Sequence, residues 1–316
     1  MTFLSILCAL LIEQLKPLRA DNMIYAWVKQ FAARMEASFN AGQQSHGRLA
    51  WLVIMAALMV PTALIYWLCT KLPFAALAWN ILVVYLTLGF RHYSHYFTSI
   101  QIALSSGDDA AARKLLAEWT KQDTSAMDAS EIARVAVEKA LVTTHRNVFG
   151  VFFWFLMPLG PACAVMYRVA EYLARAWNEP EHMRNEAFGV FAAKAFYYID
   201  FIPAHLTASA FAVVGNFEDA VYAWRNFADR WNDKAVGIIL AAGGGAMGLR
   251  LGDTSKTAAT MSAPDAVTID GVAEFDPFPG EEAGTRALQS TVGLVWRALL
   301  LWMLMLLLLS TAVWLG

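Results

Sequence analysis

The longest apolar runs of this chain limit the folds open to it. Residues 293–315 read GLVWRALLLWMLMLLLLSTAVWL and carry a single charged residue, Arg297. A helix of about 20 mostly apolar residues is long enough to cross a lipid bilayer. The composition agrees, because 58% of the residues are hydrophobic and 16% are charged, whereas a soluble domain has about 45–50% apolar and about 25% charged residues. The chain is therefore predicted to be an all-α, polytopic transmembrane helical bundle.

Five runs are predicted to span the membrane: residues 49–70, 74–90, 148–170, 190–214 and 293–315. The first two form a hairpin across the short turn 71–73. Three prolines, Pro158, Pro161 and Pro203, lie inside the third and fourth runs. Each removes a backbone hydrogen bond and is expected to bend its helix. Residues 2–12 are apolar but short, and the sequence leaves open whether they cross the membrane.

The distribution of lysine and arginine predicts the orientation. Residues 13–48 carry five of these side chains and residues 91–147 carry seven, and such an excess marks the cytoplasmic side. Two predicted spans separate these segments, so both are expected to face the cytoplasm, with the protein in a bacterial inner membrane. The chain then divides into 1–48 (a short hydrophobic segment and an interfacial helix), 49–90 (the hairpin), 91–147 (cytoplasmic helices), 148–214 (a pair of spans), 215–292 (cytoplasmic) and 293–316 (the C-terminal span).

The segments between the spans are predicted to be mostly helical. Asp108 and Asp128 each precede a helix-forming run and are expected to cap it. Residues 21–39 and 217–231 place apolar side chains on one helix face, which is typical of packing on a bundle or of lying at the membrane interface. Residues 253–285 are rich in Ala, Thr, Asp, Glu, Gly and Pro and are predicted to form a flexible acidic loop.

Charge and cysteine content exclude several classes of function. The net charge of −2 offers no strong basic field for a nucleic acid. The three cysteines are far apart in apolar runs, which argues against a disulfide framework or a zinc site. No metal site is predicted and the cofactor is unknown at this stage. The lipid bilayer is the expected partner.

The glycine-rich stretch LAAGGGAMGLRLGD, residues 240–253, supports two interpretations. Its glycines at 244, 248 and 252 are spaced by four and are predicted to lie on one helix face, where another helix can approach closely. The alternative is a ligand site lined by backbone. No Lys-Ser or Lys-Thr pair follows the glycines, so a phosphate-binding P-loop is excluded.

Two ionisable residues, Asp200 and His205, lie within the apolar run IDFIPAHLTASAF, residues 199–211. Ionisable groups at membrane depth are costly and usually mark a functional site, an ion pair or a water-lined cavity. Lys194 is close in sequence. A functional role and an ion pair therefore both stay open.

Several stretches, taken together, resemble the CobD/CbiB family of membrane proteins of cobalamin synthesis. They are LTLGFR (86–91), GDDAAARKLL (107–116), QDTSAMD and EIARVAVE (within 122–138), VFGVFFW (148–154), FG (188–189), IDFIPAHLTA (199–208) and GAMGLRLGD (245–253). They occur in the family's order. The chain is also similar to the related AmpE proteins, which are linked to the regulation of β-lactamase induction. The resemblance implies an adenosylcobinamide-phosphate synthase, which joins an aminopropanol unit to a corrinoid carboxylate as an amide.

The chain departs from the family mainly at polar positions. In the family motif Glu-Asn-Thr-x-Asp-Gly, Val142 stands for the Glu and Arg146 for the Asp, whereas Thr144 is kept. Glu138 is also kept. His205 replaces an arginine of the family. The exchange of an acid for Arg146 reverses the charge at a position of the family's site.

Three function hypotheses follow from this pattern. The preferred one is a non-catalytic or repurposed membrane protein, regulatory like AmpE; the alternative is the synthase itself, and a small-solute transporter is the third. Because family acids are missing at Val142, Arg146 and Ala174, the sequence predicts that the chain does not rescue a strain lacking the synthase. A missing stabiliser of transition-state charge typically costs about 10²–10³ in rate.

The candidate ligand-binding residues follow from the same motifs, and no catalytic residue is assigned. They are Asp123, Thr124, Glu138, Thr144, Arg146, Asp200, His205 and Arg250. Five of them (138, 144, 200, 205 and 250) are predicted to gather at the cytoplasmic side of the spans. The expected ligand is an anionic small molecule or a corrinoid, and the helices offer faces for a homo-oligomer.

Overall fold

The computed structural model describes residues 2–16, 22–40, 43–178, 186–252 and 280–315. These residues form helices and one isolated β-bridge, which confirms the predicted all-helical class. They divide into two compact units. The first unit comprises Met1–His95, Thr143–Pro203 and Trp302–Gly316, and the second comprises Tyr96–Val142 and Ala204–Leu301.

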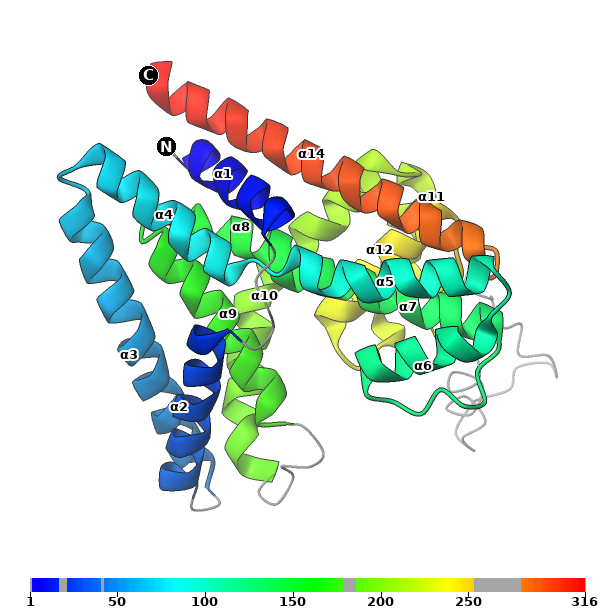
Figure 1. Cartoon of the computed structure of the whole chain (residues 1–316), viewed down its shortest axis with the longest axis horizontal. Helices are drawn as coiled ribbons and strands as arrows, with labels where there is room; N and C mark the ends of the chain where they lie inside the picture. The colour runs from blue at the N-terminus through cyan, green and yellow to red at the C-terminus, as the bar shows by residue number, and fades with distance from the viewer. Residues whose placement is uncertain (1, 17–21, 41–42, 179–185, 253–279, 316) are drawn as a thin grey trace. The chain divides into compact units, whose positions relative to one another are not determined.

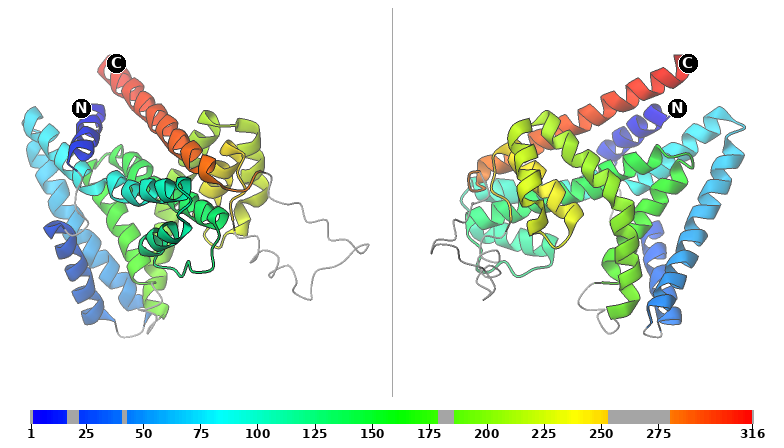
Figure 2. Two further views of the ribbon diagram at one scale, coloured as in Figure 1. Left: turned by 45° about the vertical axis from the view of Figure 1, so that its right-hand side comes forward. Right: turned by 180° about the vertical axis from the view of Figure 1, so that it is seen from behind.

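The first unit begins with four helices (Figure 1). They are α1 (Thr2–Leu15), α2 (Met23–Phe39), α3 (Gln44–Cys69) and α4 (Pro73–Thr87). Helix α2 lies along α3 in both views of Figure 2, and α1 packs on α4. The sequence predicts that residues 49–90 form two membrane spans joined by a turn. They form two helices joined by a turn, but α4 has 15 residues and is shorter than the predicted span 74–90. Pro73 occupies the first turn of α4, where its missing N–H costs no helix hydrogen bond.

The predicted span 148–170 is not one helix, which corrects the sequence-based prediction. The chain here forms the π-helix η1 (His145–Phe149), α8 (Gly150–Phe155) and α9 (Pro161–Ala176). The break spans residues 156–160, because α8 ends at Phe155 and α9 starts at Pro161. Pro158 lies in this break, and a proline lacks the N–H needed to bond back to the previous turn. Gly160, with φ 48°, then leads into α9 with a backbone conformation that favours glycine.

Helix α9 packs against α3, α4 and α8 within the first unit. The N-terminal part of α10 (Glu186–Val214) completes this packing. At Gly47 of α3, an added Cβ would lie 2.1 Å from the carbonyl oxygen of Phe188. The absence of a side chain at Gly47 therefore lets α3 approach the start of α10 closely.

The second unit is built from shorter helices. In whole or in part they are α5 (Phe90–Ser105), α6 (Asp109–Thr120), α7 (Ala129–Thr144), α11 (Phe217–Phe227), the 3₁₀ turn η3 (Ala228–Arg230), α12 (Lys234–Met247) and α14 (Thr285–Leu315), with the end of α10. Both predicted caps are confirmed. Asp108 accepts a hydrogen bond from the backbone N–H of Ala111 at 2.9 Å, and Asp128 accepts one from Glu131 at 2.8 Å.

The core of the second unit lies between α11 and α12. Its buried members are Ala208, Ala223, Phe227, Ala228, Ile238, Ala241 and Ala242, with Trp224 and Trp231 packed against them. Alanines dominate because the two helices run very close together. A Cβ at Gly245 would lie 2.4 Å from the carbonyl oxygen of Asp219. Phe217, which the predicted apolar face included, is 58% exposed.

The predicted glycine face of residues 244, 248 and 252 needs correction. Gly244 lies in α12, but Gly248 is the C-cap of that helix, with φ 67°, and Gly252 lies beyond it, with φ 97°. The glycine that allows the close helix approach is Gly245. The other two are used for backbone conformations that residues with a Cβ rarely adopt.

Three helices in the described residues, α3, α10 and α14, are long and apolar enough to cross a membrane. Helices α1, α4 and α12 are apolar but shorter. Large apolar side chains of α3 and α14 are exposed, among them Leu64 at 54% and Leu300 at 64%. These features are those of a multi-pass membrane protein. The predicted flexible loop over 253–285 lies largely outside the described residues.

Candidate functional site

The polar residues 143–147 lie where α7 passes into the π-helix η1. Residues 143 and 144 end α7, and residues 145–147 belong to η1. The backbone N–H of Gly150 bonds to the carbonyl of His145, five residues back. Such turns are rare, and they occur frequently at functional sites. Thr144 and His145 are both fully buried, although each carries polar atoms.

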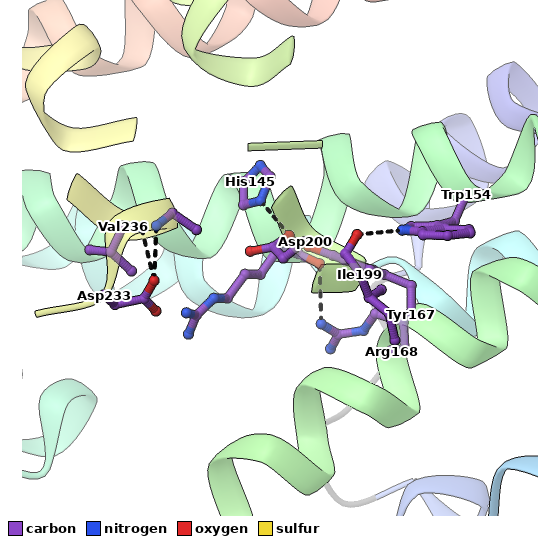
Figure 3. Close-up of polar contacts among 10 residues, drawn as sticks. His145, Trp154, Tyr167, Arg168, Ile199, Asp200, Asp233 and Val236 are labelled. Carbon is purple, nitrogen blue, oxygen red and sulfur yellow. Dashed lines mark hydrogen bonds and ion pairs between the residues drawn. The ribbon is translucent and has the colours of Figure 1, made fainter. Parts of the chain in front are cut away.

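The His145 side chain is held by Asp200 of α10 (Figure 3). A hydrogen bond of 2.8 Å joins Nε2 of His145 to Oδ1 of Asp200. The hydroxyl of Tyr167, on α9, donates to the same Oδ1 at 2.7 Å. All three side chains are buried. Unpaired polar groups at such positions would be costly, so these bonds fix how η1, α9 and α10 meet in the first unit.

The place of Tyr167 depends on Gly150. A Cβ at Gly150 would lie 2.2 Å from the Tyr167 hydroxyl oxygen. A residue larger than glycine would therefore push the phenol away from Asp200. Four residues further along α8, Trp154 donates from Nε1 to the carbonyl of Ile199 at 3.2 Å and adds a second link to α10 (Figure 3).

Charged side chains surround these three residues. Nη1 of Arg168 donates to the backbone carbonyl of Arg146 at 3.3 Å, and Nη2 donates to the Tyr25 hydroxyl at 3.2 Å. Oε2 of Glu171 lies 3.7 Å from Nη1 of Arg168, and Oε1 of Glu171 lies 3.3 Å from Nε of Arg175. The Arg146 guanidinium lies over the Phe196 ring, 5.5 Å from its centroid. The first unit thus gathers three arginines and two carboxyl groups.

The second unit holds Glu138 and Arg250 near the end of α12. Oε1 of Glu138 accepts from Arg134 at 3.0 Å and from the backbone N–H of Gly252 at 2.7 Å. The neighbouring backbone pairs with a later part of the chain: the backbone N–H of Arg250 donates to the backbone carbonyl of Glu281 at 2.8 Å. Nη2 of Arg250 lies 3.4 Å from the Gly280 carbonyl. Glu138 therefore fixes the backbone that carries Arg250.

Three further candidates have local roles in the structure. The Thr124 hydroxyl is buried and donates to the carbonyl of Arg113 at 2.8 Å. Asp123 is exposed; the backbone N–H of Ser125 donates to it at 3.0 Å, and this bond lowers the pKa of the Asp123 carboxyl below its ordinary value. His205 is half-buried and meets the Trp224 ring edge-on, with 5.6 Å between centroids.

The sequence predicts that residues 138, 144, 200, 205 and 250 lie together, and the structure tests this only within each unit. Thr144 and Asp200 belong to the first unit, and Glu138, His205 and Arg250 belong to the second. Within the first unit, Asp200 reaches His145, the residue next to Thr144. A single site made of all five residues stays a prediction.

Sequence reasoning missed His145 and Tyr167 as partners of Asp200. They are 55 and 33 residues away from it along the chain, and no local pattern encodes such a distant contact. The sequence showed only that Asp200, His145 and Tyr167 are polar residues in or beside apolar runs, which does not say that they meet. Within the described residues, no group of three His, Cys, Asp or Glu side chains is arranged to hold a metal ion.

Comparison with known proteins gives matches along most of the chain. The family model described as "CobD/Cbib protein" matches residues 7–268. A protein of Stutzerimonas stutzeri named "Cobalamin biosynthesis protein CobD" is 31% identical over 313 residues, which cover 96% of this chain and 97% of that protein. A protein of the same name from Chromobacterium violaceum is 31% identical over 66% of each chain. One from Clostridium perfringens is 25% identical over 74% of this chain and 73% of its own length. No solved structure matches.

Proposed function

Since the chain belongs to the CobD/CbiB family, we propose that it carries out the amide-forming step of cobalamin biosynthesis, as an adenosylcobinamide-phosphate synthase. The observation that carries the proposal is the extent of the similarity. It runs along nearly the whole of this chain and of a relative named for cobalamin biosynthesis. The AmpE-like regulatory role, which the sequence motifs favoured, has less support than this alternative.

The altered motifs do not leave the first unit without acidic groups. The family acids are missing at Val142, Arg146 and Ala174. Asp200 lies in a stretch that resembles the family and is kept, and Glu171 adds a second carboxyl group among the arginines of the first unit. Because these two acids are present, the missing acids do not by themselves rule out activity.

The reaction joins an amine to a carboxylate and needs cationic groups for its anionic substrates. Arg146 and Arg250 are our candidates, because a guanidinium presents a planar fork of donors that matches two oxygens. Nε of Arg250 is buried without a hydrogen-bond partner among the described residues, so it has a donor available for a ligand. Glu138 holds the backbone at Gly252, two residues from Arg250.

The finer topology is part of the same proposal. We place the segments 13–48 and 91–147 in the cytoplasm of a bacterium, joined by the hairpin of α3 and α4. This assignment is supported by their excess of lysine and arginine. Substrates of the cytoplasm would then reach the polar residues from that side.

A genetic test decides between the two functions. The chain is expressed in a cobalamin auxotroph that lacks its own synthase, and growth without added cobalamin is measured. We expect rescue, and we expect the variant Arg146→Glu to lose it. Glu118→Gln is the control and should keep rescue, because Glu118 is exposed on α6 and lies outside the candidate residues. Membrane fractions are blotted to show equal amounts of protein. A well-expressed chain that gives no growth would contradict the synthase and return the regulatory hypothesis to first place.

A further inference from the structure

Each of the two residues bound to Asp200 is followed directly by an arginine. His145 precedes Arg146 on η1, and Tyr167 precedes Arg168 on α9. Both His145 and Tyr167 bond to the same oxygen, Oδ1 of Asp200, at 2.8 and 2.7 Å. One carboxyl group therefore fixes two backbone positions, each adjacent to an arginine.

The two arginine positions are also linked directly. Nη1 of Arg168 donates to the backbone carbonyl of Arg146 at 3.3 Å. The Arg168 guanidinium therefore lies against the turn that carries Arg146. The Arg146 guanidinium is placed in turn by the Phe196 ring, 5.5 Å from the ring centroid, a distance typical of a cation–π contact.

Arg168 keeps a donor for a ligand. Its Nε is buried and has no hydrogen-bond partner among the described residues, although its Nη atoms bond to Arg146 and Tyr25. Leaving a buried charged donor unsatisfied is costly, so such a donor points to a group that the protein takes up from outside. The most suitable group is an oxyanion, because charge-assisted bonds from guanidinium to oxygen are among the strongest hydrogen bonds in proteins.

We infer that Arg146 and Arg168 together bind the phosphate group of a substrate, and that Asp200, through His145 and Tyr167, sets the positions of the two arginines. The inference rests on the proposed function, whose product carries a phosphate on its aminopropanol unit. Glu171, 3.7 Å from Arg168, offsets part of the positive charge, so the preference rests on geometry. Phosphate is favoured over carboxylate because it presents three acceptor oxygens to the guanidinium donors. In this scheme His145, Tyr167 and Asp200 are positioning residues, since they act through the arginines.

The binding test uses the full chain in lipid nanodiscs and aminopropanol O-phosphate as the probe, with inorganic phosphate and acetate alongside. Binding is followed by titration calorimetry. We expect Arg146→Lys and Arg168→Lys to weaken the binding of aminopropanol O-phosphate by about tenfold each. A lysine ammonium cannot reproduce the planar set of guanidinium donors, with which Arg168 holds Arg146 and Tyr25 and still keeps Nε for the ligand. Arg175→Lys is the matched control. Arg175 lies on α9, binds Glu171 and is half-exposed, and its substitution should leave the affinity unchanged.

The positioning residues are tested by conservative pairs. His145→Gln retains a side-chain donor and should keep most of the affinity, whereas His145→Phe removes it and should lose about tenfold, as should Tyr167→Phe. In steady-state assays the losing variants should raise KM for the phosphate substrate and leave KM for the corrinoid unchanged. A general structural defect would change both. If Asp200→Asn fails to fold, the His145 and Tyr167 variants still decide the question.

Two outcomes overturn the inference while leaving the synthase intact. One is an active protein whose affinity for aminopropanol O-phosphate is unchanged in both arginine variants. The other is binding of acetate as tight as that of phosphate. If the unmodified chain makes no product but binds phosphate in an arginine-dependent way, the proposed function fails and the binding site stands.

Discussion

The carboxyl group of Asp200 lies in an apolar stretch and yet is well accommodated. It accepts a hydrogen bond from Tyr167 and is joined to His145, and both partners are themselves buried. A polar group in such surroundings is tolerated when its hydrogen bonds are formed, and removing one partner costs more than the bond itself contributed. The three side chains therefore depend on one another, and single substitutions among them should not have additive effects.

At the same scale, Glu138 is predicted to stabilise the second unit. Glu138→Ala removes the acceptor for Arg134 and for the backbone N–H of Gly252. We expect a loss of about 1–3 kcal/mol, the usual range for charge-assisted hydrogen bonds and for donors left unpaired. Chemical unfolding in detergent measures the loss, and hydrogen exchange should rise at the amide of Gly252.

The matched control for this variant is Glu131→Ala on the same helix. The Glu131 side chain is exposed, and its backbone N–H, which bonds to Asp128, is retained in the variant. The free energy of unfolding of Glu131→Ala should be nearly the same as that of the unmodified chain. Equal stability of the two variants would show that the contact between Glu138 and Gly252 contributes little.

The sequence identifies a single residue when burying its polar group in an apolar run would cost free energy. Asp200 stands out because a carboxyl group within an apolar run needs a reason. Its partners did not stand out, since a histidine and a tyrosine far along the chain become relevant only after α9 and α10 have packed. Thr124 shows the converse: its motif suggested a ligand, and its hydroxyl instead bonds to the carbonyl of Arg113.

At the scale of elements, the close approach of α11 and α12 gives a further prediction. Gly245→Ala would place a Cβ 2.4 Å from the Asp219 carbonyl oxygen, and a backbone atom cannot move away as a flexible side chain can. Overpacking of this kind typically costs about 1–3 kcal/mol. Thermal unfolding in detergent should show a clear drop in Tm for this variant.

Gly293→Ala is the control for Gly245→Ala. It lies within α14, and an added Cβ there has no atom within 4 Å. Alanine in a helix is more favourable than glycine by up to about 1 kcal/mol, so this variant should unfold at the same or a higher temperature. A Gly245→Ala protein as stable as the control would mean that α11 and α12 separate easily.

The elements themselves were predictable to different degrees. The caps at Asp108 and Asp128 and the helices of residues 49–90 follow from local rules, and the structure confirms them. The stretch 148–170 is apolar enough for a span, but apolar content does not show whether a helix is continuous. Its break covers residues 156–160, with Pro158 inside it and Gly160 and Pro161 at its end, and the prolines suggested a bend, not an end.

For the whole molecule, the exposed apolar faces indicate a lipid environment. On α3, Val60, Leu64 and Leu68 are all more than half exposed. In water such a continuous row would promote aggregation, whereas lipid chains are a suitable neighbour. The exposed apolar faces indicate that these helices contact lipid. The side of the membrane on which each loop lies is predicted from its lysine and arginine content.

The last prediction concerns that orientation. Single cysteines are placed at the exposed positions Ser38, Ser125 and Lys71 in a chain from which the native cysteines, Cys8, Cys69 and Cys163, have been removed. The first two positions lie in the segments rich in lysine and arginine, so they should resist a membrane-impermeant thiol reagent in intact cells and react once the cells are permeabilised. Lys71→Cys, in the turn between α3 and α4, should react in intact cells because the proposed topology places that turn across the membrane from both segments. Ready labelling at Ser38 or Ser125 in intact cells would reverse the proposed topology and place the candidate site away from the substrates of the cytoplasm.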